Sequence, residues 1–198
     1  MTTITWIFVG VVLITSAGLL VTQDWRIALG LLGLQYVGAF WLTNQHWPSS
    51  MAAIKLVTGW MAIAILGMTR LSIKEINEPS EKFWSQGWIF RLFAGGIVTV
   101  IVSTAAPRVE EIIPGIGLPV IVGSLILLSL GILHLGMTAQ PFRVILGLLT
   151  VLSGFETLYA ALESSVLVAA MLSVVSLGLS LVGAYLLTVR TPEFRETA

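Results

Sequence analysis

Seven apolar segments, each long enough to cross a lipid bilayer, make up most of this sequence and limit what it can fold into. A helix rises about 1.5 Å per residue, so about 20 apolar residues span a hydrocarbon core about 30 Å thick. Because that core holds no water, each segment must satisfy its own backbone hydrogen bonds, which favours helices over open strands. The sequence therefore predicts an all-α polytopic integral membrane protein with seven spanning helices, at residues 4–21, 25–42, 51–68, 88–105, 118–135, 142–162 and 166–188.

The composition agrees with a lipid environment. Of the 198 residues, 57% are hydrophobic and 10% are charged, whereas a soluble domain carries about 25% charged residues. The formal net charge is zero, so nothing indicates a nucleic-acid partner. The sequence has no cysteine, which excludes disulfides, iron–sulfur clusters and cysteine-based catalysis. The N-terminal residues lack the basic region and cleavage site of a signal peptide, so we expect the first apolar segment to be retained.

Basic residues are distributed unevenly between the two predicted sides of the membrane. One side carries only Arg108 and, near a helix end, Lys55. The other carries Arg26, Arg70, Lys74, Lys82, Arg91, Arg143, Arg190 and Arg195. Because cytoplasmic loops are enriched in Lys and Arg, this asymmetry predicts an external N-terminus and a cytoplasmic C-terminus. We expect the membrane to be the bacterial cytoplasmic (inner) membrane.

Two parts of the sequence match each other in the same order. VGVVLITSAGLL from Val9 resembles VGSLILLSLGIL from Val122, and the pattern R-x-x-L-G-L-L begins at both Arg26 and Arg143. Chance similarity between leucine-rich helices is the alternative explanation. A duplication predicts two parallel three-helix units at 1–70 and 118–190. Residues 71–117 would then hold a polar cytoplasmic loop, a linker helix and an outer polar loop from Pro107 to Gly117, and residues 191–198 a cytoplasmic tail.

The second unit carries motifs that recur in a known group of small membrane subunits. These motifs are the Arg143 pattern, Ser153-Gly154, Ser176-Leu-Gly178 and Ala184-Tyr185. Over roughly residues 118–190 the sequence resembles the K-type three-helix subunit of respiratory complex I (NuoK). It is also similar to the C subunit of Mrp antiporters and the E component of membrane hydrogenases, with a possible second copy at 1–70. The resemblance implies a non-catalytic subunit of a larger energy-converting complex.

The sequence departs from that family at the positions of its intramembrane glutamates. Complex I K subunits carry one glutamate in the middle of each of their second and third helices. The corresponding residues here are apolar, Leu149 or Leu152 in one helix and Val174 in the other. In the first unit the position equivalent to Leu152 is Gln35. The departure favours a scaffolding role over a direct proton relay.

Two charged residues lie inside predicted spans, Lys55 and Glu156. An intramembrane charge is costly unless it is paired or hydrated, so these are the first candidates for a function. Both lie about five or six residues from the outer ends of their helices, which places them at similar depth. We therefore predict a Lys55–Glu156 pair that joins the two units. Two alternatives remain open: Lys55 extends to the head groups while Glu156 meets water or a hydroxyl, or Glu156 titrates in an ion path.

Other polar residues suggest weaker hypotheses. Gln35, near the predicted midplane, should form interhelical hydrogen bonds, with ion coordination as the alternative. His134 and Arg91 lie near the inner interface, and His134 could instead ligate a pigment or metal. One face of the last helix carries small residues that would let another helix approach closely, namely Ser173, Ser176, Ser180 and Gly183. These are packing features.

The sequence lacks the combinations of residues that catalysis requires. We find no paired carboxylates, nucleophile–base arrangement, phosphate-binding loop or cluster of metal ligands, so we expect no enzyme activity in this chain and no bound cofactor or metal. Whether the chain belongs to an ion-pumping oxidoreductase, and whether it assists ion translocation, is left open. The expected partners are lipid, larger membrane subunits and cytoplasmic subunits that bind the loop from Arg70 to Gly87. The alternatives are a stand-alone small transporter or channel, or an accessory or assembly subunit of a photosynthetic or respiratory complex.

Overall fold

The computed structural model describes residues 2–73 and 87–189, and within these ranges it contains seven α-helices and no strand. The helices are α1 (Thr2–Val21), α2 (Trp25–Thr43), α3 (Ser49–Ser72), α4 (Trp88–Ile112), α5 (Leu118–Gly136), α6 (Pro141–Leu162) and α7 (Val166–Val189). Each is long and apolar enough to cross a membrane. The predicted all-α, multi-pass integral membrane fold is confirmed.

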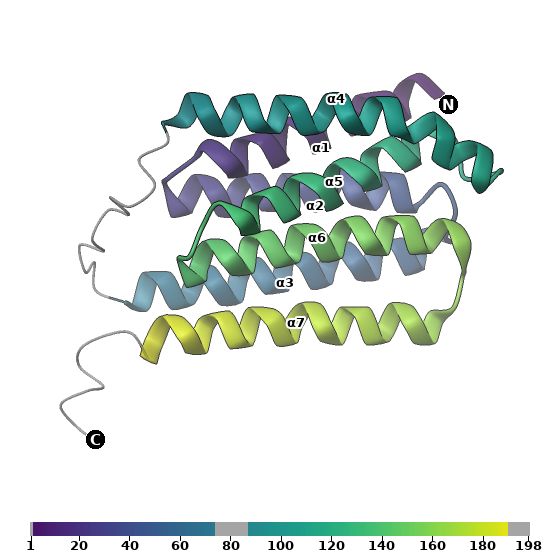
Figure 1. Cartoon of the computed structure of the whole chain (residues 1–198). Coiled ribbons are helices and arrows are strands. Elements are labelled where there is room, and N and C mark those ends of the chain that lie inside the picture. The colour runs from purple at the N-terminus through teal and green to yellow at the C-terminus, as the bar shows by residue number, and fades with distance from the viewer. Residues whose placement is uncertain (1, 74–86, 190–198) are drawn as a thin grey trace.

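The main departure from the predicted boundaries is at the end of α4. We expected the helix to end at residue 105, with a polar loop from Pro107 to Gly117, but α4 continues to Ile112. Pro107 lies inside the helix, where it lacks the amide hydrogen that would bond to the preceding turn, and the last turns bend (Figure 1). The loop that remains turns at Gly115 and Gly117, which have φ of 102° and 83° and so favour glycine.

Most of the predicted polar loop from Arg70 to Gly87 lies outside the described residues, as does the predicted tail at 191–198. The described parts of the loop are its two ends. α3 continues past Arg70 to Ser72, and Gly87 caps the N-terminus of α4. The first unit is therefore helical beyond its expected boundary at residue 70.

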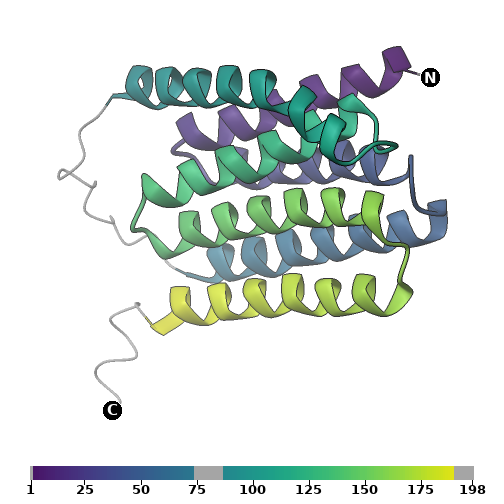
Figure 2. The same ribbon diagram turned by 45° about the vertical axis from the view of Figure 1, so that its right-hand side comes forward.

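The helices form two rows with α4 at one end (Figures 1 and 2). In one row α2 packs between α1 and α3, and in the other α6 packs between α5 and α7. The rows lie against each other through the pairs α1–α5, α2–α6 and α3–α7, while α4 packs on α1 and α5. The odd-numbered helices run from the end where the chain begins, here called the N-terminal end, to the opposite C-terminal end (Figure 1).

The contacts between the rows bear on how the two predicted units are related. A two-fold rotation about an axis between the rows would set α1 opposite α7 and α3 opposite α5. Instead α1 lies beside α5 and α3 lies beside α7, so helices at equivalent places in the two units are neighbours. If the units are a repeat, a shift from one row to the other relates them. Their superposition stays a prediction.

Two groups of buried apolar side chains hold the rows together. One lies between α1, α2, α4 and α5 and includes Leu42, Ile121 and Leu127. The other lies mainly between α2, α3 and α6 and includes Tyr36 and Leu66. In a bilayer these contacts stabilise the bundle through close packing, since lipid is as apolar as the side chains themselves. α4 and α7 are the least buried helices, and their outward faces are largely apolar.

Candidate functional site

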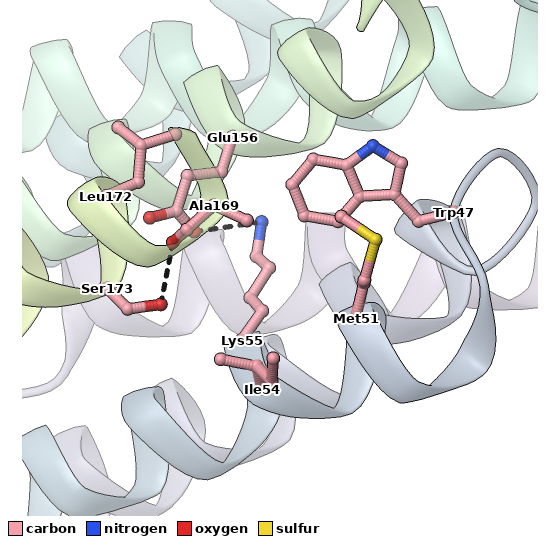
Figure 3. A pocket seen from close by; sticks show the side chains of 8 residues that line it. All are labelled: Trp47, Met51, Ile54, Lys55, Glu156, Ala169, Leu172 and Ser173. Carbon is pink, nitrogen blue, oxygen red and sulfur yellow. Dashed lines mark hydrogen bonds and ion pairs between the residues drawn. The ribbon is translucent and has the colours of Figure 1, made fainter. Parts of the chain in front are cut away.

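Lys55 and Glu156 meet inside the bundle, as their depth and charge predicted. Lys55 lies six residues after the start of α3, and Glu156 lies six residues before the end of α6. Both are therefore about 9 Å from the N-terminal end of the bundle. The Lys55 Nζ is 3.4 Å from the Glu156 Oε2, and the two residues are only 5% and 6% exposed. Lys55 thus points into the protein toward Glu156 (Figure 3) and does not extend to the head groups.

Two further oxygen atoms on α6 accept hydrogen bonds from the Lys55 ammonium. The Nζ donates to the backbone oxygen of Ser153 at 2.8 Å and to the Thr157 Oγ1 at 3.0 Å. On the other side of the pair, the Ser176 Oγ of α7 donates to the Glu156 Oε1 at 3.4 Å. The site therefore links three helices, and the ammonium has one acceptor for each of its three donors.

Ser153 and Thr157 were not among the residues predicted for this site. Both are three or fewer residues from Glu156 on α6, and with Glu156 they lie along one buried side of that helix. A search for hydroxyl residues within one helical turn of an intramembrane charge would have found both. The backbone acceptor has no such signal, because every residue has a carbonyl oxygen.

A small cavity adjoins the ion pair. It measures about 10 Å³, roughly the room that one water molecule needs. Figure 3 shows its lining, which is mostly apolar: Trp47, Met51, Ile54, Lys55, Glu156, Ala169, Leu172 and Ser173. The Trp47 Nε1 donates to the Glu163 backbone oxygen at 2.9 Å, so a hydrogen bond joins the α2–α3 connection to the α6–α7 connection.

Gln35 is completely buried on α2, and its side chain makes one long hydrogen bond. Its Oε1 accepts from the Ser16 Oγ of α1 at 3.5 Å. Its Nε2 is buried and has no hydrogen-bond partner in the described part of the chain. The amide oxygen of Gln35 therefore makes the predicted interhelical hydrogen bond, and its partner is on α1.

His134 and Arg91 lie near the C-terminal end of the bundle, and the structure does not bring them to the ion pair. His134 is buried near the end of α5, with its ring against Gly147 of α6. Arg91 donates to the Leu20 oxygen at the end of α1 at 3.3 Å. A cation near a helix C-terminus offsets the negative end of the helix dipole, so Arg91 stabilises α1. In residues 2–73 and 87–189 no three His, Asp or Glu side chains lie close enough to hold a metal ion.

The small residues of α7 form a packing face. Ser176, Ser180 and Gly183 are buried, while Ser173 is half-buried. A Cβ added at Gly183 would lie 2.8 Å from the Cγ1 of Ile145 on α6 and 3.1 Å from the Cδ2 of Leu66 on α3. The face lets α7 approach α3 and α6 closely enough for Ser176 to reach Glu156.

The positions that the resemblance aligns with glutamates of K-type subunits are Leu149 or Leu152 in α6 and Val174 in α7, and they have different surroundings; Leu152 is half-buried. Leu149 on α6 is fully buried, whereas Val174 on α7 is 69% exposed on the outside of the bundle. The polar centre of this protein therefore lies elsewhere, at Lys55 and Glu156. Comparison of the sequence and structure with models of protein families, with curated proteins and with solved structures finds no match.

Proposed function

We propose that this chain is a non-catalytic integral membrane subunit of a larger energy-converting complex, in the manner of the K-type subunits that its second unit resembles. It packs against larger membrane subunits and lies in a bacterial cytoplasmic membrane, with its N-terminus outside and its C-terminus in the cytoplasm. Its contribution to that complex is structural, and its intramembrane charges stabilise its own helices.

The observation that supports this proposal best is that the buried charged side chains bind one another and their neighbours on adjacent helices. Lys55 is fully engaged by Glu156, Ser153 and Thr157, and Glu156 is also bound by Ser176. A transporter needs polar groups that line a path for its solute, whereas these groups bind one another. The adjoining cavity has a volume of about 10 Å³, which is too small for any solute larger than a water molecule. Both features favour a subunit over a stand-alone transporter or channel.

The outer surface of the bundle supports the same proposal. α4 and α7 lie at opposite ends of the two rows (Figure 1), and both carry broad apolar faces with large exposed side chains. The exposed face of α4 also includes Gly96, where a Cβ would meet nothing within 4 Å. Such faces suit neighbouring membrane helices, which pack through small residues and close contact.

The experiment is purification of the chain, tagged at its C-terminus and expressed at its native level, in a mild detergent. We expect the chain to migrate with larger membrane subunits in one stable complex. Gly96→Trp or Val174→Trp should release the chain from that complex while leaving its own yield unchanged, because both positions face outward. Isolation of the unaltered chain alone, or only with copies of itself, would instead indicate a transporter or channel and would contradict the proposal.

A further inference from the structure

We propose that the oxygen atoms around the Lys55 ammonium form a binding site for a monovalent cation, which the native chain fills with its own lysine. The ammonium group is held at 2.8 Å by the Ser153 backbone oxygen, at 3.0 Å by the Thr157 Oγ1 and at 3.4 Å by the Glu156 Oε2. A backbone carbonyl, a hydroxyl and a carboxylate are the ligand types that bind hard cations in proteins. This inference concerns the chain itself and does not depend on its assembly into a complex.

The charge and the distances select the class of cation. The site contains one carboxylate, Glu156, so one positive charge neutralises it. The distances of 2.8, 3.0 and 3.4 Å exceed the values of about 2.0–2.1 Å for Mg²⁺ and about 2.3–2.6 Å for Ca²⁺. The oxygen atoms therefore suit ammonium or an alkali ion of similar size, such as potassium.

Three oxygen atoms come from one short stretch of α6, which fixes their geometry before any cation arrives. The Thr157 Oγ1 donates its proton to the Ser153 oxygen at 2.8 Å, which leaves its lone pairs directed at the cation. The Ser153 Oγ, on the same residue, is buried and has no hydrogen-bond partner in the described part of the chain. The cavity beside Lys55 and Glu156 gives a bound ion room for one water ligand.

The test removes the Lys55 ammonium from the site and adds a free cation in its place. Lys55→Met keeps an apolar stem of similar length and leaves the oxygen atoms without an ammonium. The purified variant is unfolded thermally in chloride salts of ammonium, potassium, sodium and the large cation N-methylglucamine at equal ionic strength. We expect ammonium and potassium to raise its Tm saturably by about 3–5 °C over N-methylglucamine. Sodium should have a smaller effect, and the unaltered protein should respond equally to all four salts.

Two further variants make the test specific. In Lys55→Met/Glu156→Gln the carboxylate is absent, so ammonium and potassium should lose their advantage. Lys55→Ala, purified throughout in potassium chloride, leaves more room for the ion and its water and should also lose stability when potassium is replaced by N-methylglucamine. Equal Tm values of Lys55→Met in all four salts would overturn the proposal. So would failure of both single variants to fold in potassium chloride, because the proposed ligand would have been present.

Discussion

Lys55→Met and Glu156→Gln should each lower the free energy of unfolding by about 3–5 kcal/mol, measured in detergent with the large ion N-methylglucamine as the only added cation. Each change leaves the other charge buried without its partner. The side chains are 5% and 6% exposed, and the adjoining cavity of about 10 Å³ has room for about one water molecule, so solvent replaces only part of the lost contact. Chemical or thermal unfolding followed by circular dichroism measures the loss.

The double variant tests whether Lys55 and Glu156 interact with each other or contribute to stability independently. Lys55→Met/Glu156→Gln strands neither charge, so it should be more stable than the sum of the single losses predicts. Arg108→Met and Glu163→Gln are matched controls, because they remove the same charges from exposed positions at the same end of the bundle. They should change the free energy by less than about 0.5 kcal/mol. Strictly additive single losses would mean that the two charges do not interact.

Gly154→Ala should destabilise the bundle by about 1–3 kcal/mol, and Gly154→Leu by more. Gly154 lies where α6 packs closely against α5. A Cβ at this position would be 2.8 Å from the Leu128 amide nitrogen and 2.9 Å from the Ser124 oxygen. Both atoms belong to the backbone, so they can give way only if one helix moves. The same unfolding measurement gives the loss.

Gly178→Ala is the matched control for this prediction. Gly178 also lies inside a helix, α7, but a Cβ there meets nothing within 4 Å. Alanine should therefore be neutral or should stabilise the protein by about 0.5–1 kcal/mol through its higher helix propensity. If both alanine variants have the same stability, close packing of α5 on α6 is not what constrains residue 154.

Hydropathy predicted the membrane spans, and charge indicated the ion pair. Both structural features depend mainly on where a residue lies along its helix. The start and end of each apolar segment fix the depth of every residue in it, so equal depth and opposite charge indicated a Lys55–Glu156 pair as one of three hypotheses, and the structure selects it. The end of α4 was not predictable in the same way. Pro107 and the polar residues after it indicated a loop, yet the helix continues to Ile112, since a helix that leaves the hydrocarbon no longer needs apolar residues.

The lateral arrangement could not be predicted from the sequence. Depth does not determine which helices are neighbours, and the contacts of α3 with α7 and of α2 with α6 depend on how side chains of many helices pack together. The hydrogen bond from the Trp47 Nε1 to the Glu163 backbone oxygen is one contact that depends on this packing. Nothing in either residue indicates that two connections more than one hundred positions apart meet. The Ser153 backbone oxygen, which accepts from Lys55, was missed for the same reason.

Single cysteines can test whether the two three-helix units enter the membrane in the same direction, because the native sequence has no cysteine. Gln45→Cys and Ser164→Cys place thiols at the N-terminal end, one in each unit, while Gln23→Cys and Ala139→Cys place them at the C-terminal end. All four positions are exposed. An impermeant maleimide added to intact cells should label Gln45→Cys and Ser164→Cys, and should label Gln23→Cys and Ala139→Cys only after permeabilisation. Labelling of Gln45→Cys and Ser164→Cys from opposite sides of the membrane would contradict the parallel arrangement.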